Sequence, residues 1–181
     1  AADSRLPSHL GPYEVLNVIG RGGMGLVLLG RDTKLDRFVA IKLISAELAF
    51  YSAARLRFLA EARAAAKLRH PRIVTIFGVH DDEGLPFLVM EYVPGRSLEQ
   101  ELKAQAPFEL TQILRVGRQV ASALQLAHAR GLVHRDIKPA NILVDHETGD
   151  VKLTDFGLAA PVSDSGAASS SEAIACAGTP S

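Results

Sequence analysis

The stretch from His134 to Asn141 reads HRDIKPAN and lies between two short apolar runs. This pattern predicts a polar loop between buried strand-like segments, and buried charges on such a loop need partners. Asp136 could accept a hydroxyl proton, Lys138 could hold a transferring phosphoryl group, and Asn141 could bind a hard cation through its amide oxygen. The alternative is a salt-bridged turn with no chemical role.

A second carboxylate follows at a strand-to-loop junction, where the chain reads Thr154-Asp155-Phe156-Gly157. Carboxylate and amide oxygens are the ligands that Mg²⁺ prefers in proteins. Asp155 together with Asn141 therefore suits a magnesium ion that holds a nucleotide, which favours the chemical interpretation over the salt-bridged turn.

The glycine-rich stretch from Gly20 to Gly25 reads GRGGMG, and β-type runs precede and follow it. This order predicts strand, glycine turn and strand, in which the backbone can approach phosphates closely. A dinucleotide-binding turn has the same spacing but must lead into a helix, so a dinucleotide-dependent oxidoreductase is set aside. A flexible glycine hairpin without function remains an alternative.

Lys42 lies inside the β-type run from Phe38 to Ile44, which is otherwise fit for burial on both faces. Alternation puts Ala40 and Lys42 on one face, so an adenine could pack on Ala40 while Lys42 reaches phosphates. A lysine at a strand edge is the alternative. A buried lysine needs a partner with the opposite charge.

Residues from about 46 to 69 are rich in Ala, Leu, Arg and Glu and predict an amphipathic helix. Its apolar stripe consists of Phe58, Ala62, Ala65 and Leu68. Glu61 lies next to this stripe, where it could pair with Lys42 or, on the solvated face, with Arg57. The sequence leaves both pairings open.

Downstream patterns predict a second hairpin, a connector and a long helix. Residues 73–77 and 87–90 form β-type runs around a turn at residues 81–84, and Glu91-Tyr92-Val93 then leads into Pro94-Gly95. Residues 110–130 carry apolar side chains at helical spacing and end at a glycine, which is typical of a buried helix with a glycine C-cap.

These motifs, in this order, resemble a protein kinase catalytic domain, and most of all the bacterial Ser/Thr kinases related to the eukaryotic ones. The resemblance implies an α+β, two-lobe fold. Residues 1–12 would be a linker, residues 13–93 a small β-rich N-lobe with one helix and the hinge, and residues 94–181 a partial, helical C-lobe that ends in the activation segment.

The resemblance also implies the reaction, which is transfer of the γ-phosphate of Mg-ATP to a Ser or Thr hydroxyl of a protein substrate. Asp136 would position the hydroxyl and accept its proton, and Lys138 would neutralise the γ-phosphate. Lys42, fixed by Glu61, would orient the other phosphates. The metal ligands would be Asn141 and Asp155.

The residues that the resemblance assigns to nucleotide binding belong to the glycine-rich loop, the adenine slot and the hinge. They are Ile19, Gly20, Arg21, Gly22, Gly23, Met24, Gly25, Val27, Ala40, Lys42, Met90, Glu91, Val93 and Leu143. Adenine would use the backbone of Glu91 and Val93, Met90 would control the depth behind the base, and Leu143 would form the lower wall.

After Gly157 the chain turns to Ser, Ala and Gly, which predicts an activation loop. Its hydroxyls, if phosphorylated, could pair with Arg135 and Arg57. Ala160 weakens this hypothesis, because relatives often have a basic residue there. The candidate acceptors are Ser163, Ser165, Ser169, Ser170, Ser171 and Thr179.

Composition limits the partners. Twenty basic and twenty acidic residues cancel, which argues against a nucleic-acid partner, and Cys176 has no second cysteine to pair with. No apolar run is long enough to span a bilayer and no secretory signal opens the chain. We therefore expect a cytoplasmic location, either free or as the cytoplasmic part of a membrane-anchored kinase. The alternative function is a nucleotide-binding or scaffold fragment without catalysis.

Overall fold

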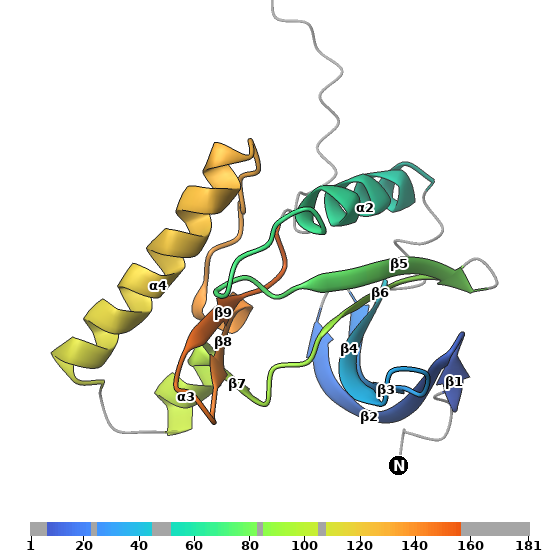
Figure 1. Cartoon of the computed structure of the whole chain (residues 1–181), viewed down its shortest axis with the longest axis horizontal. Helices are drawn as coiled ribbons and strands as arrows, with labels where there is room; N and C mark the ends of the chain where they lie inside the picture. Colours follow the sequence, from blue (N-terminus) through green and yellow to red (C-terminus); the bar gives the residue numbers. More distant parts are fainter. Residues whose placement is uncertain (1–6, 23–24, 45–51, 83–84, 105–107, 157–181) are drawn as a thin grey trace, which may run out of the picture.

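The computed structural model describes residues 7–22, 25–44, 52–82, 85–104 and 108–156 of the 181-residue chain. A curled sheet with one helix beside it forms one lobe, and two helices around a smaller sheet form the other (Figure 1). The strands are β1 (His9–Leu10), β2 (Tyr13–Gly22), β3 (Gly25–Asp32), β4 (Arg37–Ile44), β5 (Ile76–Asp82), β6 (Leu85–Glu91), β7 (Gly95–Ser97), β8 (Ile142–Asp145) and β9 (Val151–Leu153). The helices are α2 (Ser52–Ala65), α3 (Leu98–Ala104), α4 (Leu110–Ala129) and the short 3-10 helix η1 (Pro139–Asn141).

The six-stranded sheet is antiparallel, in the order β1-β2-β3-β4-β6-β5. Its central strand β4 is buried on both faces, with Val39 and Ile41 on one side and Ala40 and Lys42 on the other. The predicted order of strand, glycine turn and strand is confirmed by the pairing of β2 with β3. Gly25 has a φ of 137°, a backbone conformation that favours glycine.

The predicted linker of residues 1–12 overlaps this sheet, because its last part contains β1. Leu10 is buried in the sheet core with Tyr13 and Leu28, and the Val15 amide donates to the Ser8 carbonyl at 2.9 Å. Burial of Leu10 and backbone pairing with β2 thus hold this segment in the fold, which its Pro and Ser content did not indicate.

The predicted hairpin is present, but its first strand begins later than expected, at Ile76. Ile73 instead forms a parallel bridge with Leu153 of β9, and the Val74 amide donates to the Leu153 carbonyl at 2.9 Å. A β-branched run can pair with β6 or with β9 equally well. Only the three-dimensional structure shows that Ile73 and Val74 pair with β9 of the small sheet.

The helices follow their predicted stripes only in part, because α4, which was expected to be buried, buries only Ala123 and Ala127 and leaves Ile113 exposed. Ala62, Ala65 and Leu68 are buried, although α2 ends at Ala65 and residues 45–51 lie outside the described residues. Gly131 follows the end of α4 with a φ of 72°, as expected of a C-terminal glycine. The short helix α3 and strand β7 were not predicted. In the described residues, no helix combines the length and the apolar character needed to cross a bilayer.

Candidate active site

A cleft of about 470 Å³ lies between the two lobes. Its volume is typical of sites that bind a small molecule. Ala40, Met90 and Val93 form its buried apolar part, and Val27 and Leu143 pack against them. The polar end of the cleft contains Thr154 and Asp155.

The cleft brings together most of the residues predicted to bind nucleotide. Those that line it are Ile19, Gly20, Arg21, Val27, Ala40, Met90, Glu91, Val93 and Leu143. Gly22 and Gly25 lie at the ends of β2 and β3, whereas Gly23 and Met24 fall outside the described residues. Lys42 lies beside the cleft through its contact with Asp155.

Lys42 is paired with Asp155, whose Oδ1 lies 2.7 Å from the lysine Nζ. The resemblance to kinases implied Glu61 as the partner of Lys42, whereas sequence spacing also allowed Glu61 to pair with Arg57. Glu61 instead places its Oε1 4.0 Å from Nη1 of Arg135. The need of a buried ammonium group for a carboxylate is thus met by Asp155, which sequence spacing alone could not distinguish from Glu61.

Asp136 is held by two side chains of its own loop. Its Oδ2 lies 2.7 Å from Lys138 Nζ, and Asn141 Nδ2 donates to the same oxygen and to the Asp136 carbonyl, both at 2.9 Å. Lys138, and to a smaller extent Asn141, hold the pKa of Asp136 below its usual range. The carboxylate is therefore ionised at neutral pH.

His134 connects the two carboxylate segments, a role that the sequence analysis missed. It is 1% exposed, and its Nε2 donates to the Thr154 carbonyl at 2.8 Å while its Nδ1 accepts from the Asp136 amide at 3.3 Å. Burial lowers the pKa of His134, so the ring is neutral with its proton on Nε2. Its ring centroid lies 4.5 Å from that of Phe156. The only sequence signal was a histidine directly after an apolar run.

Comparison with known proteins agrees with this geometry. The family model described as the protein kinase domain matches residues 13–179. The chain belongs to the protein kinase family. The kinase fold inferred from the motifs is thereby confirmed.

Among proteins similar to this kinase domain, the serine/threonine-protein kinase PrkC of Bacillus subtilis is 43% identical over 84% of the chain, and 24% of PrkC is covered. The serine/threonine-protein kinase PknB of Mycobacterium tuberculosis is 41% identical over 88% of the chain, and 26% of PknB is covered. The chain thus spans about a quarter of the length of these relatives. The crystal structure of the Mycobacterium tuberculosis PknI kinase domain superimposes with a TM-score of 0.77 at 32% identity, covering 86% of this chain and 64% of that one.

The predicted metal ligands of this kinase domain lie on connected segments, because the Thr154 amide donates to the Asn141 carbonyl at 3.0 Å. The side chains of Asn141 and Asp155 offer hard oxygen atoms, which suit Mg²⁺. Within the described ranges, no group of three or more His, Cys, Asp or Glu side chains could hold a metal ion. As a pair of oxygen donors, Asn141 and Asp155 fit a magnesium ion, which in proteins is usually bound by one or two side chains together with phosphates and water.

Proposed function

We propose that the protein is an ATP-dependent serine/threonine protein kinase that uses Mg²⁺. The observation that carries this proposal is that His134 connects the Lys42–Asp155 pair, at the polar end of the cleft, to the Asp136–Lys138 pair of the adjoining loop. The names of the relatives support Ser and Thr as acceptors. We further propose that this domain lies in the cytoplasm, where ATP is available.

The nucleotide would lie with its base in the apolar part of the cleft, between Ala40 of β4 and Leu143 of β8. The backbone of Glu91 and Val93 would supply hydrogen bonds to the base. Lys42 would then be at the phosphate end, because its ammonium group contacts Asp155 there.

In the reaction, the hydroxyl oxygen of the protein substrate forms a bond to the γ-phosphorus as the bond from that phosphorus to the ADP oxygen breaks. Asp136 accepts the hydroxyl proton, and Lys138 neutralises charge on the phosphoryl group. Mg²⁺, held by Asn141 and Asp155, would neutralise charge on the phosphates. Positioning and electrostatics, rather than covalent catalysis, would supply the rate.

A titration of ATP with and without Mg²⁺ tests the proposal. Mg²⁺ should strengthen ATP binding to the unmodified chain and should do so much less in the Asp155→Asn variant. Asp36→Asn is the matched control, because Asp36 is exposed in the β3–β4 turn and pairs with Arg31. Binding that is indifferent both to the metal and to Asp155→Asn would contradict the metal assignment.

For the 181-residue chain taken alone we propose nucleotide binding without detectable peptide phosphorylation. The outer face of α4 supports this, since Leu110, Ile113 and Leu114 are 68%, 53% and 63% exposed. Apolar side chains that are exposed to solvent in this way contribute little to the stability of the lobe that carries Asp136. Transfer of labelled phosphate from ATP to a Ser/Thr peptide by this chain would contradict this proposal.

A further inference from the structure

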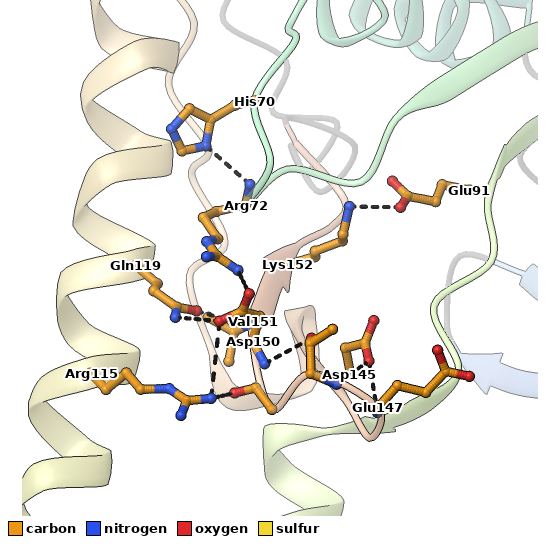
Figure 2. Close-up of polar contacts among 12 residues, drawn as sticks. His70, Arg72, Glu91, Arg115, Gln119, Asp145, Glu147, Asp150, Val151 and Lys152 are labelled. Carbon is orange, nitrogen blue, oxygen red and sulfur yellow. Dashed lines mark hydrogen bonds and ion pairs between the residues drawn. The ribbon is translucent and has the colours of Figure 1, made fainter.

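Strand β9 leads directly into Asp155, so the position of this strand determines where that carboxylate lies. The strand has only three residues, and its partner in the small sheet is β8. Polar side chains at and just before β9 nevertheless contact three other parts of the molecule (Figure 2).

The first contact joins β9 to the end of β6 and to the residue that precedes β5. Lys152 Nζ lies 2.6 Å from Glu91 Oε1, and both side chains are partly buried. The other carboxylate oxygen of Glu91 accepts from the Thr75 amide at 3.2 Å, and the Glu91 amide donates to the Thr75 carbonyl at 2.8 Å. Lys152, from the lobe with the small sheet, therefore reaches a carboxylate that is already fixed within the lobe with the six-stranded sheet.

The second contact holds the residue before β9. Asp150 forms an ion pair with Arg72 and accepts from Gln119 Nε2 of α4 at 2.8 Å. The same amide side chain accepts from the Val151 amide at 2.7 Å. The backbone of Arg72 is also engaged, because its carbonyl accepts from the Leu153 amide at 2.8 Å. Arg72 lies in the connection between α2 and β5, so this contact again joins the lobes.

We propose that the Lys152–Glu91 and Arg72–Asp150 pairs are interlobe ties, and that Lys152 and Arg72 are positioning residues that hold Asp155 opposite Lys42. This inference rests on the proposed nucleotide site. Neither Lys152 nor Arg72 would contact the reacting atoms. They act through β9, whose last residue is two positions before Asp155.

Lys152 has an additional electrostatic consequence, because Glu91 lines the cleft. With Lys152 in place, the Glu91 carboxylate is neutralised. Without it, the Glu91 carboxylate beside the cleft is left uncompensated, and its negative charge repels a polyanionic nucleotide. Loss of Lys152 should therefore weaken nucleotide binding, and the loss should be smaller at high ionic strength.

The test compares Mg-ATP affinity of the 181-residue chain and its Lys152→Met variant at low and high salt. We expect Lys152→Met to weaken binding about fivefold at low salt, the scale of one partly exposed charge interaction. Lys152→Arg, which keeps the charge, should stay within about twofold of the unmodified chain. Lys103→Met is the matched control, since Lys103 also pairs with a glutamate, at 3.4 Å, but within the single helix α3.

A double-mutant cycle provides a second measurement that does not depend on one variant folding well. Glu91→Gln should remove most of the effect of Lys152→Met, because the charge that Lys152 neutralises is then absent. A purely structural role would lower the melting temperature in both variants without this coupling and without salt dependence. Additive effects on affinity would overturn the electrostatic part of the proposal.

Hydrogen exchange without nucleotide separates this proposal from the proposed function. In Lys152→Met the amides of Thr75 and Leu153 should exchange faster, whereas Lys103→Met should leave them unchanged. Unchanged exchange at both amides would show that Lys152 does not tie the lobes. If the unmodified chain did not bind Mg-ATP, the proposed function would fail, but the exchange result would still show whether Lys152 ties the two lobes together. If it bound and Lys152→Met bound equally well, the positioning role alone would be refuted.

Discussion

The two halves of the candidate active site, one on the sheet and one on the loop after α4, each contain a lysine–aspartate pair with an N–O distance of 2.7 Å, but the surroundings of the pairs differ. In the sheet half, Lys42 is 7% exposed and lies on a strand that is hydrogen-bonded on both edges. In the loop half, Lys138 is 51% exposed and lies between Asp136 and η1.

This difference suits the two pairs to different tasks, the first to nucleotide binding and the second to phosphoryl transfer. A buried ammonium group on a paired strand has little freedom, so Lys42 suits the fixed phosphates of a nucleotide. An acceptor hydroxyl must arrive from solvent, so the residues that receive it must be reachable. Asp136 and Lys138 fulfil this condition because their loop is only partly covered.

The sharpest way to test the comparison is Asp136→Asn in the natural protein at full length. Turnover should fall by about 10²-fold or more, the scale of general acid–base catalysis, while ATP affinity stays within about twofold. The amide keeps the size of the side chain but cannot accept the proton. Steady-state kinetics and calorimetry measure the two quantities, with Asp36→Asn as the control.

Unchanged turnover in Asp136→Asn would remove this residue from its proposed role. A large loss of ATP affinity would instead show that the loop half of the site also contributes to nucleotide binding.

The converse prediction concerns Lys42→Met, which removes the cation from the sheet half. ATP affinity should fall about tenfold or more, since a hydrogen bond between charged groups is worth about 1.5–3 kcal/mol. Isothermal titration of the purified chain measures this loss. Lys34→Met in the exposed β3–β4 turn is the control, and equal affinities for Lys42→Met and Lys34→Met would exclude Lys42 from the phosphate site.

The sequence predicted the sheet half better than the loop half. β4 and the glycine turn follow from alternation and from glycine spacing, which are local properties. The partner of Lys42 and the pairing of Ile73 with Leu153 depend on residues far apart in the chain, so spacing could not decide them.

The same limit explains His134. Its type and position were visible, but its function depends on the Thr154 carbonyl, twenty residues further along. The chemistry of the side chains, together with the resemblance to kinases, supplied the predicted roles of Asp136 and Asn141. The contacts that connect their loop to Asp155 became apparent only in three dimensions.

Hydrogen exchange compares the stability of the two halves directly. Among the residues of α4 only Ala123 and Ala127 are buried, whereas β4 has a series of buried side chains. We expect amides of residues 110–130 to exchange about fivefold or more faster than those of residues 38–43, which corresponds to about 1 kcal/mol in opening free energy. Equal, slow protection in both segments would show that the helix half is as well supported as the sheet.

The smallest predicted effect concerns the pH dependence of stability at the tie beside β9. Arg72, more than any other group, holds the pKa of Asp150 below its usual value of 3.8. The folded state therefore favours the ionised carboxylate. Its stabilising contribution is complete above pH 3.8 and is lost as the pH falls through the lower, folded-state pKa, because the unfolded chain binds the proton first.

Asp150→Asn should accordingly flatten the fall in unfolding free energy below about pH 4, while changing it by at most about 1 kcal/mol at pH 7, since the pair is partly exposed. Part of the fall should remain, because the pKa of Asp136 is lowered too. Urea unfolding at a series of pH values measures the curve, and Glu147→Gln, an exposed change of the same charge three residues away, is the control. Parallel curves for Asp150→Asn and the unmodified chain would mean that the Arg72–Asp150 pair contributes nothing to holding β9 against the connection between α2 and β5.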